Sequence, residues 1–202
     1  MPRKPSQRGY TAVEMMVTMI VIVIAAAIAF FSLADSLPVT HVNTALDTTM
    51  QVLRSARQKA IDQRTTIQVT LNAPSSAVHS LTVYRIVPSG TPIFIETIPL
   101  PSDVQFYADP SLAGIPNPPD KVGNGQVAID FEDPTTLSPG NQVYFLPDGS
   151  GRSSNGNVEN GVVYIDRPGY WKFTRAISMF GATGRLRSWR LQQTSPGVWA
   201  WQ

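Results

Sequence analysis

A long uncharged stretch near the start of the chain constrains the fold more than any other feature of the sequence. Residues Met15–Ala34 contain no charged side chain, and only Thr18 and Ser32 are polar. As an α-helix, a stretch of this length extends ~30 Å, which matches the hydrocarbon core of a bilayer. Basic residues hold a helix end on the cytoplasmic side, so the preceding charges predict one membrane crossing with residues beyond about 35 outside the cytoplasm. These charges belong to Arg3, Lys4 and Arg8.

Glu14 separates two interpretations of this stretch. In an ordinary secretory signal, Val17–Ile24 would be the apolar region and Ala25–Ala27 or Ala27–Ala29 the small-residue cleavage site. The released protein would then carry no membrane anchor. A carboxylate costs up to ~2.5–3.5 kcal/mol at the centre of a membrane helix and less near its end, and an ordinary signal has no use for it. Glu14 therefore favours an anchor that is retained.

A second helical pattern follows the apolar stretch. Ser36-Leu37-Pro38 predicts a kink or a short break, because proline lacks an amide hydrogen and disfavours helix in the residue before it. Beyond it, apolar residues recur at steps of three and four, which predicts an amphipathic helix packed on a sheet. The stripe consists of Val42, Ala45, Leu46, Met50, Leu53, Ala56, Ala60 and Ile61. The basic side chains of this section are expected to be a solvated face; they are Arg54, Arg57, Lys59 and Arg64.

After Arg64 the apolar period changes to two, which predicts a mostly antiparallel β domain. Residues 108–125 and 147–160, which are rich in turn residues, are expected to be long connections. The expected strands are Thr65–Leu71, Leu81–Val87, Ile93–Leu100, Gln126–Phe131, Gln142–Leu146, Gly161–Ile165 and Tyr170–Met179.

The segment Gly9-Tyr10-Thr11-Ala12-Val13-Glu14, with a basic leader before it and an apolar stretch after it, resembles the class III signal of type IV pilins and type II secretion pseudopilins. The resemblance implies cleavage between Gly9 and Tyr10 by a prepilin peptidase, which also methylates the new amine. Glu14 would then face the Tyr10 ammonium of a neighbouring subunit, and the pair would set the docking register because each buried charge alone is costly. A plain anchor whose Glu14 reaches the membrane surface is the simpler alternative.

The stretches "LRSARQKAIDQRTTIQVTL" (53–71), "VYFLPDGSGR" (143–152) and "GRLR" (184–187) resemble the GspH/FimT family of minor pseudopilins and minor pilins. The resemblance implies a pilin-like α+β fold, in which a long N-terminal helix with a membrane-spanning first half packs on an antiparallel β-sheet or β-sandwich. The implied division is a leader at 1–9, a helix at 10–64 and a periplasmic β domain at 65–202. The implied partners are the prepilin peptidase, the inner membrane and other pseudopilins or pilins, with unidentified cargo.

Two functions follow from this resemblance. The first is a GspH-like minor pseudopilin, a structural subunit of the periplasmic pseudopilus of a type II secretion system. The second is a FimT-like minor pilin that binds DNA for uptake, since Gly184-Arg185-Leu186-Arg187 matches the Gly-Arg-x-Arg motif of that branch. Arg185 and Arg187 would share one face of a strand, and Arg190 adds charge beside them. The simpler alternative is an ordinary hairpin. Gly184 would then lie in its turn, and the arginines would pair with carboxylates of the acidic segment 70–144.

No enzymatic activity, metal or cofactor is expected. The chain has no cysteine, which excludes disulfides and thiolate metal sites. His41 and His79 have no identifiable catalytic partner, and the oxygen-rich residues around Asn155–Glu159 are more simply a polar turn than a calcium loop. Gly123–Ala128 precedes a strand, the reverse of a dinucleotide-binding context. The aromatic residues near the C-terminus are expected to fill a core or a subunit interface.

Overall fold

The computed structural model describes residues 11–75, 77–88, 90–123, 125–132, 139–153 and 156–202. The predicted leader 1–9 and Tyr10 lie outside the described residues, so the predicted cleavage between Gly9 and Tyr10 stays a prediction. The chain divides into two compact units, Met1–Pro38 and Val39–Gln202, and each is described by itself.

The first unit holds the beginning of α1 (Ala12–Gln63), the long N-terminal helix. Large apolar side chains from Val13 to Ile28 are between 54% and 69% exposed. A helix that is apolar on all sides has no polar face to turn toward water. The side chains of residues 29–34, the end of the predicted membrane span, lie outside those described. Among the described residues, no helical stretch combines the length and the hydropathy needed to traverse a bilayer.

Helix α1 is assigned without interruption across Ser36, Leu37 and Pro38. Of the two predicted alternatives, the short break is therefore wrong, and the kink stays a prediction. A proline inside a helix removes one i to i−4 hydrogen bond, and the bonds on either side can sustain the helix across that loss.

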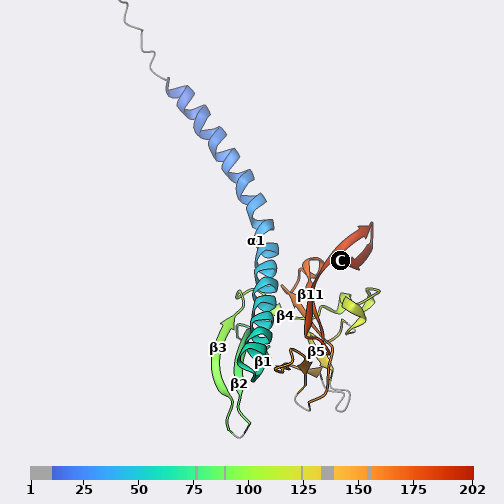
Figure 1. The fold of residues 1–202 in the computed structure, drawn as a ribbon. Helices are drawn as coiled ribbons and strands as arrows, with labels where there is room; N and C mark the ends of the chain where they lie inside the picture. Colours follow the sequence, from blue (N-terminus) through green and yellow to red (C-terminus); the bar gives the residue numbers. More distant parts are fainter. Residues whose placement is uncertain (1–10, 76, 89, 124, 133–138, 154–155) are drawn as a thin grey trace, which may run out of the picture. The chain divides into compact units, whose positions relative to one another are not determined.

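In the second unit, the last part of α1 packs as its stripe predicted. The buried side chains are Val42, Ala45, Leu46, Met50, Leu53, Ala56 and Ala60, each at most 4% exposed. Ile61, the last predicted member, is half-buried. Thr49 lies within the buried face, where its hydroxyl donates to the carbonyl of Ala45 at 2.8 Å and so avoids an unpaired polar group. Figure 1 shows this part of α1 beside the strands β1, β2 and β3.

The first sheet is antiparallel and has the strand order β3-β2-β1-β7-β8. Val69 pairs with Val83 on one side and with Val143 on the other, and all three side chains are buried in the core that includes the α1 stripe. The strands are β1 (Thr66–Asn72), β2 (Ser80–Ile86), β3 (Ile93–Pro99), β7 (Gln142–Phe145) and β8 (Gly151–Arg152).

The second sheet has the order β12-β11-β10-β9-β5-β6, and β4 pairs with β9. Its strands are β4 (Gln105–Phe106), β5 (Ile129–Glu132), β6 (Pro139–Gly140), β9 (Gly161–Asp166), β10 (Arg175–Phe180), β11 (Arg185–Ser195) and β12 (Val198–Trp201). Short 3-10 helices lie between strands, at η1 (Pro110–Gly114), η2 (Pro119–Lys121) and η3 (Trp171–Phe173).

The central strands β9 and β10 of the second sheet are buried on both faces, whereas β11 is largely exposed. Side chains alternate across a strand, so Val163 and Ile165 of β9 join the core shared with α1, whereas Val162 and Tyr164 join a second cluster. Four half-buried tryptophans pack against that second cluster: Trp171, Trp189, Trp199 and Trp201. The tryptophans agree with the prediction that the C-terminal aromatic residues fill a core or a subunit interface, whereas Phe180 is 47% exposed and lies outside the core.

The expected fold class is confirmed: a long N-terminal helix packs on antiparallel sheets in an α+β arrangement. Two strands begin several residues later than the sequence predicts: β10 begins at Arg175 and not at Tyr170, and β5 begins at Ile129 and not at Gln126. A tight turn takes the residues before β10. In it, the amide of Thr174 donates to the carbonyl of Trp171 at 3.1 Å, and the Thr174 hydroxyl donates to the same carbonyl.

Candidate functional site

The start of α1 places Glu14 in a reciprocal capping arrangement with Thr11. The amide of Thr11 donates to Oε2 of Glu14 at 3.4 Å, and the amide of Glu14 donates to Oγ1 of Thr11 at 3.3 Å. This is a capping box, which satisfies two amide donors that a helix start leaves without partners. Both distances exceed the usual 2.7–3.2 Å, so the cap is weak. The Thr-x-x-Glu spacing signals this role in the sequence, and our sequence interpretation missed it.

The turn between β10 and β11 brings Gly184 against the second part of α1. Gly184 has a φ of +61°, and a Cβ there would lie 2.1 Å from the carbonyl oxygen of Gly149 and 2.8 Å from Nε of Arg57. That Nε donates to the same Gly149 carbonyl at 3.0 Å. The glycine of the Gly-Arg-x-Arg motif therefore has a structural reason, because only glycine fits this conformation and this space.

Arg187, the second arginine of the motif, is paired with Asp120 of η2. Its Nη1 lies 2.8 Å from Oδ1 of Asp120. Ser178 donates to the other carboxylate oxygen of Asp120 and accepts a hydrogen bond from Nε1 of Trp189 at 2.8 Å. Partial burial alone would raise the pKa of Asp120, but the hydrogen bonds from Ser178 and Arg187 outweigh it and hold the pKa below its usual value. This ion pair is the one expected if β10 and β11 form an ordinary hairpin whose arginines pair with carboxylates of segment 70–144.

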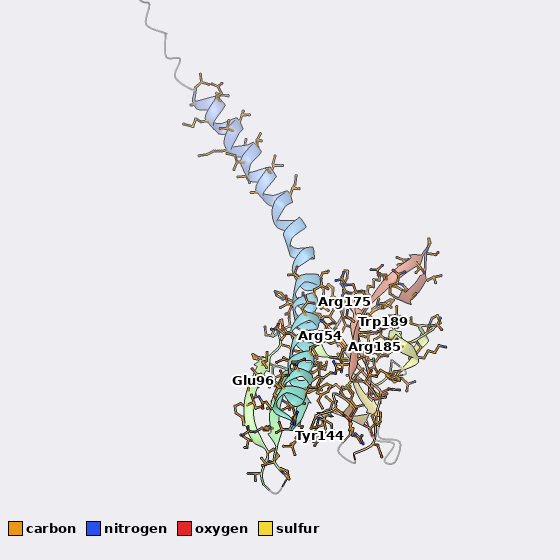
Figure 2. The ribbon with its side chains drawn as sticks, viewed as in Figure 1. Arg54, Glu96, Tyr144, Arg175, Arg185 and Trp189 are labelled. Carbon is orange, nitrogen blue, oxygen red and sulfur yellow. The ribbon has the colours of Figure 1, made fainter. Side chains whose placement is uncertain are left out.

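Arg185, the first arginine of the motif, lies in different surroundings. It is exposed and lines a cavity of about 670 Å³ together with Arg54 and Arg57 of α1 and with residues of the β10–β11 turn. Figure 2 labels Arg54 on α1 and Arg185 at the start of β11. Arg54 and Arg57 were expected only to form a solvated face, so their meeting with Arg185 is a finding of the structure.

Arg190 stands apart from the other two arginines. Alternation along β11 places it on the opposite face from Arg185 and Arg187. Its charge lies close enough to Arg175 to contribute, after burial, to the lowered pKa of that side chain. The three candidate residues for DNA binding thus lie in three different places. Arg187 is in an ion pair, Arg185 lines a cavity, and Arg190 is on the opposite face of β11.

The remaining polar motifs do not form a further site among the described residues. Within the described ranges, no three His, Asp or Glu side chains are grouped as metal ligands. Asn155 of the polar turn lies outside those ranges. His79 is buried and accepts a hydrogen bond from the amide of Phe106 at 2.9 Å, and burial lowers its pKa. His41 contacts the carboxylate of Asp103 at 2.9 Å, which ties α1 to the segment after β3.

Comparison with known proteins yields little at the level of sequence. No family model matches the chain, and no curated protein matches it. Among solved structures, the chain is similar to the type IV minor pilin FimU of Pseudomonas aeruginosa strain PAO1. The two share 14% identity with a TM-score of 0.45, over 73% of this chain and 87% of that one.

Proposed function

We propose that this chain is a non-enzymatic structural subunit of a pilus-like filament, specifically a GspH-like minor pseudopilin that supports protein secretion by a type II secretion system. A prepilin peptidase would cleave it after Gly9 and methylate Tyr10. Met15–Ala34 would then hold it in the inner membrane, with the β domain in the periplasm, until neighbouring subunits take it into the filament. The mechanism is packing between subunits.

The observation that carries this proposal is the exposed first part of α1, headed by a single carboxylate. Apolar side chains from Val13 to Ile28 are exposed to a degree that a water-soluble helix does not sustain. Lipid before assembly and neighbouring helices after it would cover this surface. Glu14 is the one charge on it. The weak cap leaves this carboxylate able to exchange its hydrogen bonds for an ion pair with a neighbour's Tyr10 ammonium.

Three substitutions separate the two roles of Glu14. Glu14→Gln keeps a side chain that can complete the capping box but removes the charge. Thr11→Ala removes the cap and keeps the charge, and Glu14→Ala removes both. We expect both Glu14 variants to fall at least about tenfold in filaments sheared from cells and measured by immunoblot, since an unpaired buried ammonium costs well over 1.4 kcal/mol. Thr11→Ala should assemble normally.

Normal assembly of Glu14→Gln would refute the ion-pair role. Mass spectrometry of the mature N-terminus tests processing separately. A methylated Tyr10 is expected, whereas a start near Ile28 or Phe30 would identify an ordinary secretory signal and refute the proposal.

The alternative function, DNA binding by a FimT-like minor pilin, has less support. A nucleic-acid site gains affinity by contacting several phosphates in succession. Of the three candidate residues, Arg187 is paired with Asp120 and Arg190 lies on the other face of β11. Arg185 is exposed beside Arg54 and Arg57, which places three arginines around one cavity and not in a row.

A further inference from the structure

The cavity beside Arg185 concentrates positive charge between two elements that are distant in sequence. Arg54 and Arg57 reach it from α1, and Arg185 reaches it from the first position of β11. No Asp or Glu is among the residues that line it. Arg54 and Arg185 form no hydrogen bond or salt bridge with the described residues, in contrast to Arg187. Arg185 acts on Asp120 through its charge alone, which helps to lower the pKa of that carboxyl. The three guanidinium groups around the cavity still repel each other, and an anion that enters between Arg54 and Arg185 relieves this repulsion.

The cavity is built into the fold, and Arg57 is held in place within it. The hydrogen bond from its Nε to the Gly149 carbonyl fixes the guanidinium, and the missing side chain of Gly184 lets the turn close over it. Arg185 follows Gly184 directly, so the closure that fixes Arg57 also sets the position of Arg185. Arg54 lies three residues before Arg57, which places both on the same side of the helix.

Two apolar side chains, Phe180 and Leu186, line the cavity beside the polar Gln58 and Thr183. Phe180, the last residue of β10, is 47% exposed, and Leu186 is half-buried. A ligand that fills the cavity therefore presents an oxyanion to the arginines and apolar atoms to Phe180. Guanidinium groups bind carboxylates with two parallel hydrogen bonds.

We infer that this cavity binds an acidic segment of a neighbouring protein subunit, whose Asp or Glu carboxylate enters between Arg54 and Arg185 while an adjacent apolar side chain covers Phe180. The arginines converge on one cavity and do not extend as a row, because the next arginine along the same face of β11 is neutralised by Asp120. Convergence suits one carboxylate better than a succession of phosphates. The identity of the partner as a filament subunit rests on the proposed function.

The test uses the full-length protein in nonionic detergent and fluorescence anisotropy of two labelled peptides, one of alternating leucine and glutamate and one of alternating leucine and glutamine. A labelled oligothymidine of equal formal charge is the third probe. We expect the glutamate peptide to bind, and Arg54→Gln or Arg185→Gln to weaken its Kd at least about tenfold, because charge-assisted hydrogen bonds are lost. Arg190→Gln is the matched control, since it removes one exposed charge from the opposite face of β11, and it should leave the Kd unchanged.

Equal binding of the two peptides, equal effects of all three substitutions, or no binding would overturn the inference. Tighter binding of oligothymidine that is lost in Arg54→Gln and Arg185→Gln would also overturn it, and would assign the cavity to nucleic acid. The measurement is made on isolated monomers and needs no assembly. Its failure is therefore distinguishable from normal assembly of Glu14→Gln, which would refute the proposed function.

Discussion

The two parts of α1, before and after Pro38, differ in how many apolar residues they hold and in whether those residues are buried. Before Ile28, large apolar side chains surround the helix and are exposed. After Val39, apolar residues keep to one stripe, and the stripe is buried by the sheets of the same chain. The difference lies in how apolar residues are distributed around the helix. A stripe can be covered by one neighbouring layer, whereas a helix that is apolar on all sides cannot be.

The largest expected effect separates the two parts directly. Leu53→Ala should lower the free energy of unfolding of the β domain by ~2–5 kcal/mol, because Leu53 is fully buried and its truncation leaves a cavity. Ile22→Ala, its matched control in the exposed part, should change it by less than ~0.5 kcal/mol. Urea denaturation in detergent, followed by tryptophan fluorescence, measures both, since all four tryptophans lie in the β domain. Equal effects would abolish the distinction between the two parts.

The unfolding free energy of the buried part is expected to depend on pH, because of Asp166. Asp166 lies near Arg175, whose Nε donates to Asn43 of α1 at 2.9 Å. Burial, reinforced by the charge of Asp109, raises the pKa of Asp166 to about 6, although the hydrogen bond from the amide of Arg167 and the charge of Arg175 act in the opposite direction. The native state therefore holds a proton between pH ~4 and ~6 that the unfolded chain releases. Its unfolding free energy falls as pH rises through that window, by ~3 kcal/mol.

Asp166→Asn removes this contribution. The variant should match the unsubstituted protein near pH 4 and exceed its stability near pH 7, as measured by urea denaturation at each pH. Asp103→Asn provides a control of opposite sign. Burial alone would raise the pKa of Asp103, but His41 and Arg167 lower it, so its contribution is present above pH ~4 and is lost as pH falls further. A constant difference between Asp166→Asn and the unsubstituted protein at all pH values would contradict the assignment.

The smallest expected effect concerns the turn that closes onto the buried part of α1. Gly184→Ala should destabilise the β domain by ~1–3 kcal/mol, because the new Cβ meets the Gly149 carbonyl and the backbone is left-handed. Gly197→Ala has the same kind of backbone, with a φ of +80°, but nothing within 4 Å of the new Cβ. The stability that Gly197→Ala loses in thermal unfolding therefore measures the backbone strain alone. Equal losses would show that the turn does not press on Arg57.

The sequence was informative wherever a local period determines burial. The stripe from Val42 to Ala60 and the change of period after Arg64 predicted the helix and the antiparallel strands, because each depends on spacing within one element. The sequence did not predict the turn at Trp171–Phe173, because its apolar residues are equally typical of a strand.

For contacts between distant segments, the sequence predicted at most that the motif arginines could pair with carboxylates of segment 70–144, and not which residues would meet. The pairing of Arg187 with Asp120 depends on a left-handed residue in η2, whose φ is +49°. The meeting of Arg54 and Arg57 with Arg185 depends on strand order, because it requires the β10–β11 turn to close on α1. Neither relation leaves a periodic trace in the residues involved.

Two adjacent residues of the Gly-Arg-x-Arg motif are constrained in different ways. The turn requires glycine at position 184 for steric reasons, whatever the neighbouring surface binds. The residue after it, Arg185, is exposed and lines the cavity. On the inference above, a homologue that replaced Arg185 would keep the fold and lose the proposed carboxylate, so the two neighbouring positions are under separate constraints.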